Sequence, residues 1–301
     1  MESDSLEVQD VNLYQSLGLR EIRLLLIRAA PFDDPLVCDL IIRTVDENQL
    51  YDALSCAWGG TEHRQMVILN KVSHEITANL GNALRHLRRT EEYLTLWVDS
   101  LCINQMDIDE KAIQIGMMGD IYRRAACVRV WIGLREDEDL RIEELSNLWK
   151  LPGNPFGLPY WRRVWIQQEL TNAAEVIVHC GDRLSPFRWW TKACDPRFYF
   201  TLTEKSFISS KHYELVSGAN LMASFRAMRK YTGRISDHEF QLQFLNSQMY
   251  RETSDPRDKI YGILDLVDHW HGGKFAADYN ASGFRSLRER SSVNGGSLET
   301  P

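Results

Sequence analysis

The chain has 301 residues, of which 44% are hydrophobic, and a formal net charge of −7. This length and apolar content allow a sizeable buried core, in one large domain or two ordinary ones. The acidic balance disfavours a general electrostatic attraction to nucleic acid or to anionic membranes.

Cysteine usage and the N-terminus bear on the compartment. The six cysteines are widely spaced, form no Cys-x-x-Cys pair and mostly lie in apolar runs, which is typical of reduced thiols. The N-terminus is acidic and lacks a signal peptide, and no apolar run is long enough to span a membrane. We therefore expect a cytoplasmic protein with no membrane span.

The first half of the chain predicts short strands and one helix. Leu- and Ile-rich runs at 22–27 and 38–43 flank a proline-bearing turn and indicate two strands, which could extend a sheet or shield its edge. Residues 51–57 form a compact strand that stops at Trp58-Gly59-Gly60, and 66–69 is a further brief strand. Thr77 can cap a helix that runs to about residue 89.

The next segment repeats strand, loop and helix. A buried strand at 94–99 ends on Asp99, Asp107 begins a capping-box-like helix, and 127–132 returns to strand. An amphipathic helix is expected at 136–150. Another opens near Pro159 and stacks Trp161, Trp165 and Glu169 on one face, before a strand at 175–179. This alternation predicts an α/β fold with a mostly parallel sheet flanked by helices.

The last third of the chain has a helical pattern in place of alternating strands and helices. Helical spacing at 206–229, 237–250 and 256–267, without strand signals between them, predicts a helical region, and the polar, Ser- and Gly-rich tail is expected to be disordered. The predicted organisation is therefore N-terminal strands in 1–50, a core domain in 51–185, a helical accessory region in 186–284 and a disordered tail in 285–301.

Several long motifs resemble the fungal heterokaryon-incompatibility (HET) domain. They are Tyr51-Asp-Ala-Leu-Ser-Cys-Ala-Trp-Gly59, Trp97-Val-Asp-Ser-Leu-Cys-Ile-Asn-Gln-Met-Asp107, Arg163-Val-Trp-Ile-Gln-Gln-Glu169 and Ser254-Asp-Pro-Arg-Asp-Lys-Ile-Tyr261. The resemblance as a whole covers roughly residues 51–279. The resemblance implies a protein that triggers growth arrest and cell death when genetically different fungal cells fuse.

HET domains are regarded as distant relatives of TIR domains, which are flavodoxin-like signalling and NAD-cleaving modules. Trp165-Ile-Gln-Gln-Glu169-Leu170 is similar to the Trp-Cys-Leu-x-Glu-Leu segment of plant TIR domains, whose glutamate is catalytic. The resemblance therefore implies a TIR-like sheet and makes Glu169 the candidate catalytic carboxylate. Ile166-Gln167 depart from that segment.

A single carboxylate suits the cleavage of NAD. Loss of nicotinamide passes through an oxocarbenium-like state that a carboxylate beside the ribose stabilises, and the leaving group is already cationic. Indole rings next to Glu169 would desolvate it and raise its pKa. The alternative is an ordinary helix glutamate paired with Arg162 or Arg163.

Other candidate binding residues surround the predicted strand ends. The turn at Gly59 and Gly60, with Arg64 close behind, suits a phosphate or ribose, and Trp58 and Trp165 could stack on the ligand. Asp99 lies where open parallel sheets bind ligands, although bracing of the loop is the alternative, and bracing is favoured for Asn104 and Gln105. A plain turn and core packing are the corresponding alternatives for the glycines and tryptophans.

Two further chemistries are disfavoured. Cys102 lies between Leu101 and Ile103, which favours burial over nucleophilic catalysis. His269 and His271 lack a further ligand cluster, so we expect no structural metal and no cofactor other than NAD as a substrate.

Two molecular functions stay open. In one, the protein cleaves NAD or a related nucleotide with Glu169; in the other, it is a non-enzymatic signalling or oligomerisation module. A Glu169 that faces a cleft beside Gly59 would favour the enzyme, and one in a buried salt bridge would favour the module. As partners we expect a sensor or incompatibility protein, with homo-oligomerisation as a further option, and no nucleic acid.

Overall fold

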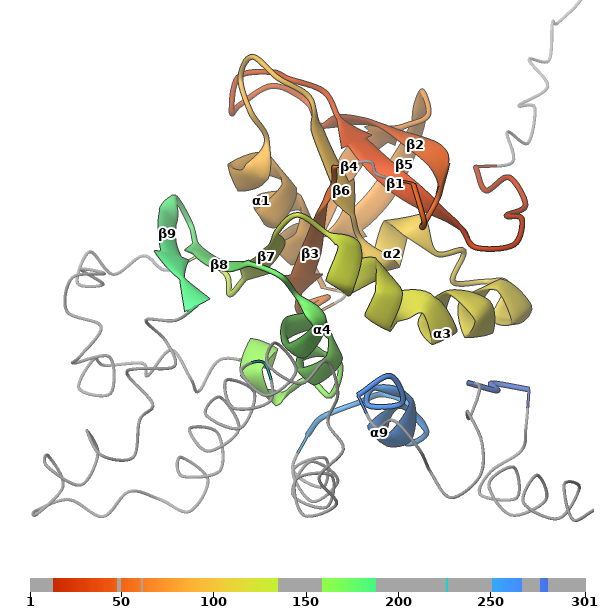
Figure 1. The fold of residues 1–301 in the computed structure, drawn as a ribbon. Coiled ribbons are helices and arrows are strands. Elements are labelled where there is room, and N and C mark those ends of the chain that lie inside the picture. Colours follow the sequence, from red (N-terminus) through yellow and green to blue (C-terminus); the bar gives the residue numbers. More distant parts are fainter. Residues whose placement is uncertain are drawn as a thin grey trace, which may run out of the picture.

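A computed structural model of the chain describes residues 13–47, 50–60, 62–134, 159–187, 226, 251–266 and 277–280. Within these residues, one sheet forms the centre of the molecule and helices lie on both sides of it (Figure 1). None of the described helices is long and apolar enough to cross a membrane.

The sheet has nine strands in the order β5-β4-β2-β1-β6-β3-β7-β8-β9. Their bounds are β1 Glu21–Ile27, β2 Val37–Thr44, β3 Asp52–Cys56, β4 Arg64–Leu69, β5 Val72–Thr77, β6 Leu94–Trp97, β7 Val128–Trp131, β8 Val176–Cys180 and β9 Arg183–Pro186. All five residues of β3 are buried, as expected for a strand with neighbours on both edges and helices on both faces.

Strand direction differs between the centre and the edges of the sheet. Strands β6, β3, β7 and β8 run parallel, as the alternating pattern of the core predicts. The N-terminal strands form an antiparallel hairpin, and β1 pairs antiparallel with β6, so this hairpin extends the sheet rather than shielding its edge. The sheet thus leans parallel, as the sequence predicts, and antiparallel hairpins at its edges make it mixed.

Local capping signals place two helices. Helix α1 (Ala78–Leu87) begins after Thr77, whose side chain accepts the amide of Leu80. Helix α3 (Ile108–Arg124) begins after Asp107, whose carboxylate accepts the amides of Asp109 and Glu110. In Figure 1, α1 lies on one side of β3 and β6, and α3 lies on the other.

The core joins α3 to the middle of the sheet. Trp97 of β6 and Tyr122 of α3 are both buried and pack edge to face, with ring centroids 5.4 Å apart. The hydroxyl of Tyr122 donates to the carbonyl of Leu54 in β3 at 3.1 Å. This bond satisfies the buried hydroxyl of Tyr122 and fixes the position of α3 against the strand that leads into the Gly59 turn.

The segment after Pro159 differs from the single helix that the sequence predicts. A 3₁₀ turn (Pro159–Arg162) is followed by a break and then by α4 (Ile166–Asn172). The break arises where Arg163 pairs as an isolated bridge with Glu252, and Val164 donates its amide to the Glu252 carbonyl. Trp161 and Glu169 therefore do not share one continuous helical face.

Short helices complete the described structure. Helix α2 (Asp99–Cys102) follows β6 directly, so Asp99 begins a helix instead of ending a strand. Helix α9 (Asp258–Tyr261) falls within the helix expected at 256–267, and in Figure 1 it lies below the sheet with α4. The helices expected at 136–150 and 237–250, the tail at 285–301 and all of 206–229 except Arg226 lie outside the described residues.

Candidate functional site

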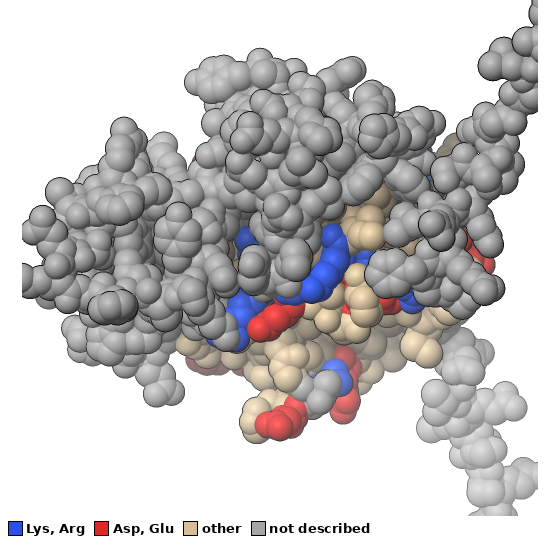
Figure 2. Space-filling view, turned by 90° about the horizontal axis from the view of Figure 1, so that it is seen from below, with Lys and Arg blue, Asp and Glu red and all other residues tan. Residues whose placement is uncertain are grey.

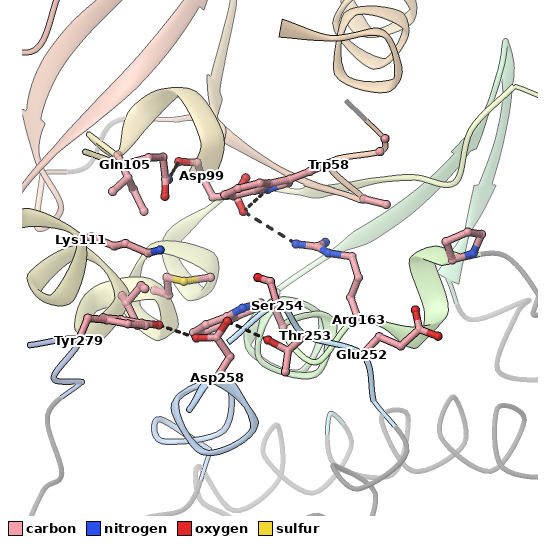
Figure 3. Close-up of a pocket in the computed structure, with 18 residues that line it drawn as sticks. Trp58, Asp99, Gln105, Lys111, Arg163, Glu252, Thr253, Ser254, Asp258 and Tyr279 are labelled. Carbon is pink, nitrogen blue, oxygen red and sulfur yellow. Dashed lines mark hydrogen bonds and ion pairs between the residues drawn. The ribbon is translucent and has the colours of Figure 1, made fainter. Parts of the chain in front are cut away.

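A pocket of about 550 Å³ lies at the carboxyl ends of β3 and β6. Its first wall comes from residues that directly follow these strands, including Trp58, Gly59, Gly60 and Asp99, and its second wall comes from segments far along the chain (Figure 3). Ligands of open α/β sheets bind at this edge, and the volume suits a small molecule. We call it the strand-end pocket.

The turn after β3 is held by Asn79, in the first turn of α1. Asn79 donates to the carbonyl of Ala57 at 2.6 Å and accepts from the indole of Trp131 at 3.0 Å. Gly59 has a φ of +79°, and a Cβ placed on it would lie 3.1 Å from Cβ of Asn79. Glycine is therefore favoured at this position, both for backbone conformation and for the close approach of Asn79.

Trp58 and Asp99 join the two strand ends. The indole Nε1 of Trp58 donates to Oδ2 of Asp99 at 3.0 Å, while the residue as a whole remains 45% exposed. Bracing of the following loop, as predicted, involves Gln105, which donates to the Asp99 carbonyl at 3.0 Å, and Asn104, which accepts the amide of Met106 at 3.2 Å. Gln105 also lines the pocket.

Glu169 is fully buried and does not line the pocket. One carboxylate oxygen accepts the hydroxyl of Ser55 from β3, and Ser55 in turn bonds the hydroxyl of Tyr160 at 2.7 Å. The other oxygen lies 3.5 Å from Nη2 of Arg163. Burial raises the pKa of Glu169, although the charge of Arg163 opposes the shift.

Arg163 connects Glu169 to the pocket that it lines. Its Nη2 lies 3.9 Å from Oδ2 of Asp99, on the pocket side, in addition to its contact with Glu169. Burial alone would lower the pKa of Arg163, but the two carboxylates Glu169 and Asp99 outweigh it and raise the pKa above its usual range. The guanidinium therefore stays charged at the boundary between the buried carboxylate and the cavity.

The second wall is formed by residues 252–258 and Tyr279. Asp258 accepts the hydroxyl of Tyr279 at 2.6 Å and the hydroxyl of Thr253 at 2.9 Å. Arg257 pairs with Asp255 at 2.7 Å and donates to the Tyr279 carbonyl at 3.0 Å, so it connects this segment to Tyr279. The same segment also completes the pocket, through Thr253, Ser254 and Asp258.

Five of the predicted site residues meet at the strand-end pocket, namely Trp58, Gly59, Gly60, Asp99 and Trp165. Arg64 does not, because it lies exposed on β4, and Glu169 lies behind Arg163. Two cations that line the pocket were not predicted as binding residues. They are Lys111 and Arg163, and the sequence suggests Arg163 only as an ion-pair partner of Glu169. Figure 2 shows the face seen from below, where acidic and basic side chains lie side by side.

The sequence disfavours two chemistries, nucleophilic catalysis by Cys102 and binding of a structural metal. Cys102 is buried and accepts the amide of Val98, and burial raises the pKa of its thiol to about 12, so it is not a thiolate at neutral pH. No group of three or more metal-ligating side chains occurs in the part of the chain that the structure describes. His269 and His271 lie outside that part.

Residues 51–155 match the model of the family described as "Heterokaryon incompatibility protein (HET)". The curated "Heterokaryon incompatibility protein 6, OR allele" of Neurospora crassa is 34% identical over 159 residues, a match that covers 47% of this chain and 23% of that protein. The chain thus spans about a quarter of the length of this relative. No solved structure matches, and the TIR-like relation of the sheet stays a prediction.

Proposed function

We propose that the chain is a heterokaryon incompatibility (HET) domain protein and that it acts in heterokaryon incompatibility, as an effector whose strand-end pocket binds a nucleotide. The observation that carries the proposal is the position of this pocket. It lies at the carboxyl ends of the parallel strands, and the wall that Trp58, Gly59 and Asp99 form belongs to the segment that matches the family, residues 51–155.

The proposed reaction is cleavage of NAD or a related nucleotide. The bond between the ribose and nicotinamide breaks, its electron pair leaves with the nicotinamide nitrogen, and water adds to the ribose carbon with release of a proton. Glu169 would stabilise the positive charge that develops on the ribose. Because Arg163 lies between this carboxylate and the pocket, catalysis requires the arginine side chain to turn away.

The second candidate is a signalling or oligomerisation module without enzymatic activity. A specific observation favours it: Glu169 is buried, hydrogen-bonded to Ser55 and ion-paired with Arg163, and it does not face the pocket beside Gly59. This is the arrangement that we expect from the sequence for the module, and the enzyme therefore depends on movement of Arg163. In this case the pocket would bind a regulatory ligand, or the surface around it would contact a partner.

Expression in a filamentous fungus tests the role and separates the candidates. Growth and cellular NAD would be followed for the wild type, for Glu169→Gln and for the matched control Glu75→Gln, which removes an exposed glutamate from β5. Growth arrest with loss of NAD, abolished only by Glu169→Gln, is expected for the enzyme. Arrest with unchanged NAD in all three proteins would favour the module, and absence of arrest would contradict a role as an effector that acts alone.

A further inference from the structure

Five charged side chains line the strand-end pocket, three of them acidic and two basic: Asp99, Glu252, Asp258, Lys111 and Arg163. Their number alone suggests a slightly acidic cavity. The hydrogen bonds that they make lead to a different conclusion, because a group whose donors or acceptors are already used has little left for a ligand.

The three carboxylates are already engaged with donors from the protein. Asp99 accepts from the Trp58 indole and from the amide of Ser100. Asp258 uses one oxygen for the Tyr279 hydroxyl and the other for Thr253. Glu252 is 63% exposed and turns toward Arg162, with 3.3 Å between Nη1 and Oε1.

The two cations keep unused donors. The ammonium of Lys111 lies 5.0 Å above the ring of Tyr279, and its charge helps to lower the pKa of Asp255. Among the described residues no carboxylate oxygen lies within 4.0 Å of this ammonium, so its donors form no close ion pair. Nη1 of Arg163 is buried and has no acceptor among the described atoms. Figure 3 shows both side chains pointing into the pocket from opposite sides, below Trp58 and Asp99. The hydrogen-bond donors that remain available in the pocket therefore suit an anion.

We propose that the strand-end pocket binds the phosphate groups of a small molecule between Lys111 and Arg163. This site rests on the proposed function in one respect, because the phosphates would be those of the nucleotide proposed above. Two cations on opposite sides of the pocket suit a diphosphate, which carries acceptors on both phosphorus atoms. Trp58, whose ring is partly exposed, offers a stacking surface for an attached base. A cavity of about 550 Å³ favours a small molecule over a phosphorylated protein segment.

Calorimetric titration of the purified chain with inorganic pyrophosphate, ADP-ribose and adenosine tests the site. Lys111→Gln removes the charge, Lys111→Arg retains it, and Lys71→Gln makes the same charge change in the exposed β4–β5 turn. Pyrophosphate and ADP-ribose should bind the wild type and Lys71→Gln alike, at least tenfold more weakly to Lys111→Gln, and again tightly to Lys111→Arg. Unfolding midpoints of the variants verify that each is folded.

Three results would overturn the proposal: no binding of pyrophosphate or ADP-ribose to the wild type, unchanged affinity in Lys111→Gln, or adenosine binding as tightly as ADP-ribose. These titrations involve no reaction, so they are independent of NAD cleavage. If binding depends on Lys111 but the protein releases no nicotinamide, the phosphate site is supported and the enzymatic function is contradicted. If the protein releases nicotinamide with the same KM in Lys111→Gln and wild type, the enzymatic function is supported and the phosphate site is contradicted.

Discussion

The guanidinium of Arg163 lies between the carboxylate of Glu169 and the strand-end pocket. Its Nη2 is 3.5 Å from Oε1 of Glu169 and 3.9 Å from Oδ2 of Asp99, while Glu169 itself is fully buried. One side chain therefore contacts both a carboxylate at the pocket and a carboxylate behind it. Any ligand that attracts Arg163 would change the surroundings of Glu169.

Removal of the Arg163 charge should destabilise the protein strongly. Arg163→Met leaves Glu169 buried without its ion-pair partner, and removal of one member of a buried pair typically costs about 3 kcal/mol. Urea unfolding of wild type and variant measures the loss. Arg28→Met, which breaks an exposed pair with Asp39, is the control and should shift the unfolding midpoint far less. Equal, small shifts in both variants would mean that the buried pair contributes nothing.

The buried state of Glu169 predicts a specific pH dependence. Because burial raises its folded-state pKa above 4.5, the folded protein holds this proton more tightly than the unfolded chain does. The resulting stabilisation is present below pH 4.5 and is lost as the pH rises through the folded-state pKa. Relative to Glu169→Gln, the wild type should thus lose unfolding free energy as the pH increases from 4.5. A difference between the two proteins that stays constant with pH would contradict the raised pKa.

His179 should make the fold sensitive to acid. Burial and the nearby charge of Arg129 lower the pKa of this histidine from 6.5 to about 3, so the unfolded chain takes up a proton that the folded protein does not. Its contribution is present above pH 6.5 and is lost as the pH falls towards 3, by about 1.4 kcal/mol per pH unit. Unfolding of His179→Phe between pH 6.5 and 5 should show a flatter slope than unfolding of the wild type. Identical slopes in His179→Phe and the wild type would refute the prediction.

The two glycines of the turn should respond differently to alanine. Gly59→Ala places a Cβ against Asn79 at a positive φ, which costs about 1–2 kcal/mol and displaces the pocket wall. At Gly60 nothing lies within 4 Å of the added atom, so Gly60→Ala should change stability little. Thermal unfolding and ADP-ribose titration of both variants check this. If Gly60→Ala were as impaired as Gly59→Ala, the positive φ and the Asn79 contact at Gly59 would not be the cause of the impairment.

Local signals in the sequence account for much of the first wall of the pocket. Thr77 and Asp107 cap their helices as predicted, because a cap depends on residues within one turn of the helix. The β5 hairpin was missed, although Asn70 and Lys71, with φ of 50° and 68°, form the type of two-residue turn that joins antiparallel strands. Asn-Lys is a weaker signal for this turn than Asn-Gly.

The second wall depends on contacts that no local pattern encodes. Arg163 leaves the predicted helix because its backbone pairs with Glu252, which lies far along the chain. Glu169 consequently points to Ser55 under the sheet instead of lying on a face shared with Trp161. Lys111 belongs to a helix that was predicted, but its position near Tyr279 requires docking of the C-terminal segment, which periodicity cannot reveal.

The central claim is that the carboxylate behind Arg163 acts on a nucleotide in the strand-end pocket. Its most direct test is the release of nicotinamide from NAD by the purified chain, fused to a coiled coil that clusters it, for wild type, Glu169→Gln and Glu75→Gln. The account predicts release by the wild type and by Glu75→Gln, and a rate lower by about 10²–10³ for Glu169→Gln. No release from the clustered wild type, or equal release from Glu169→Gln, would contradict it.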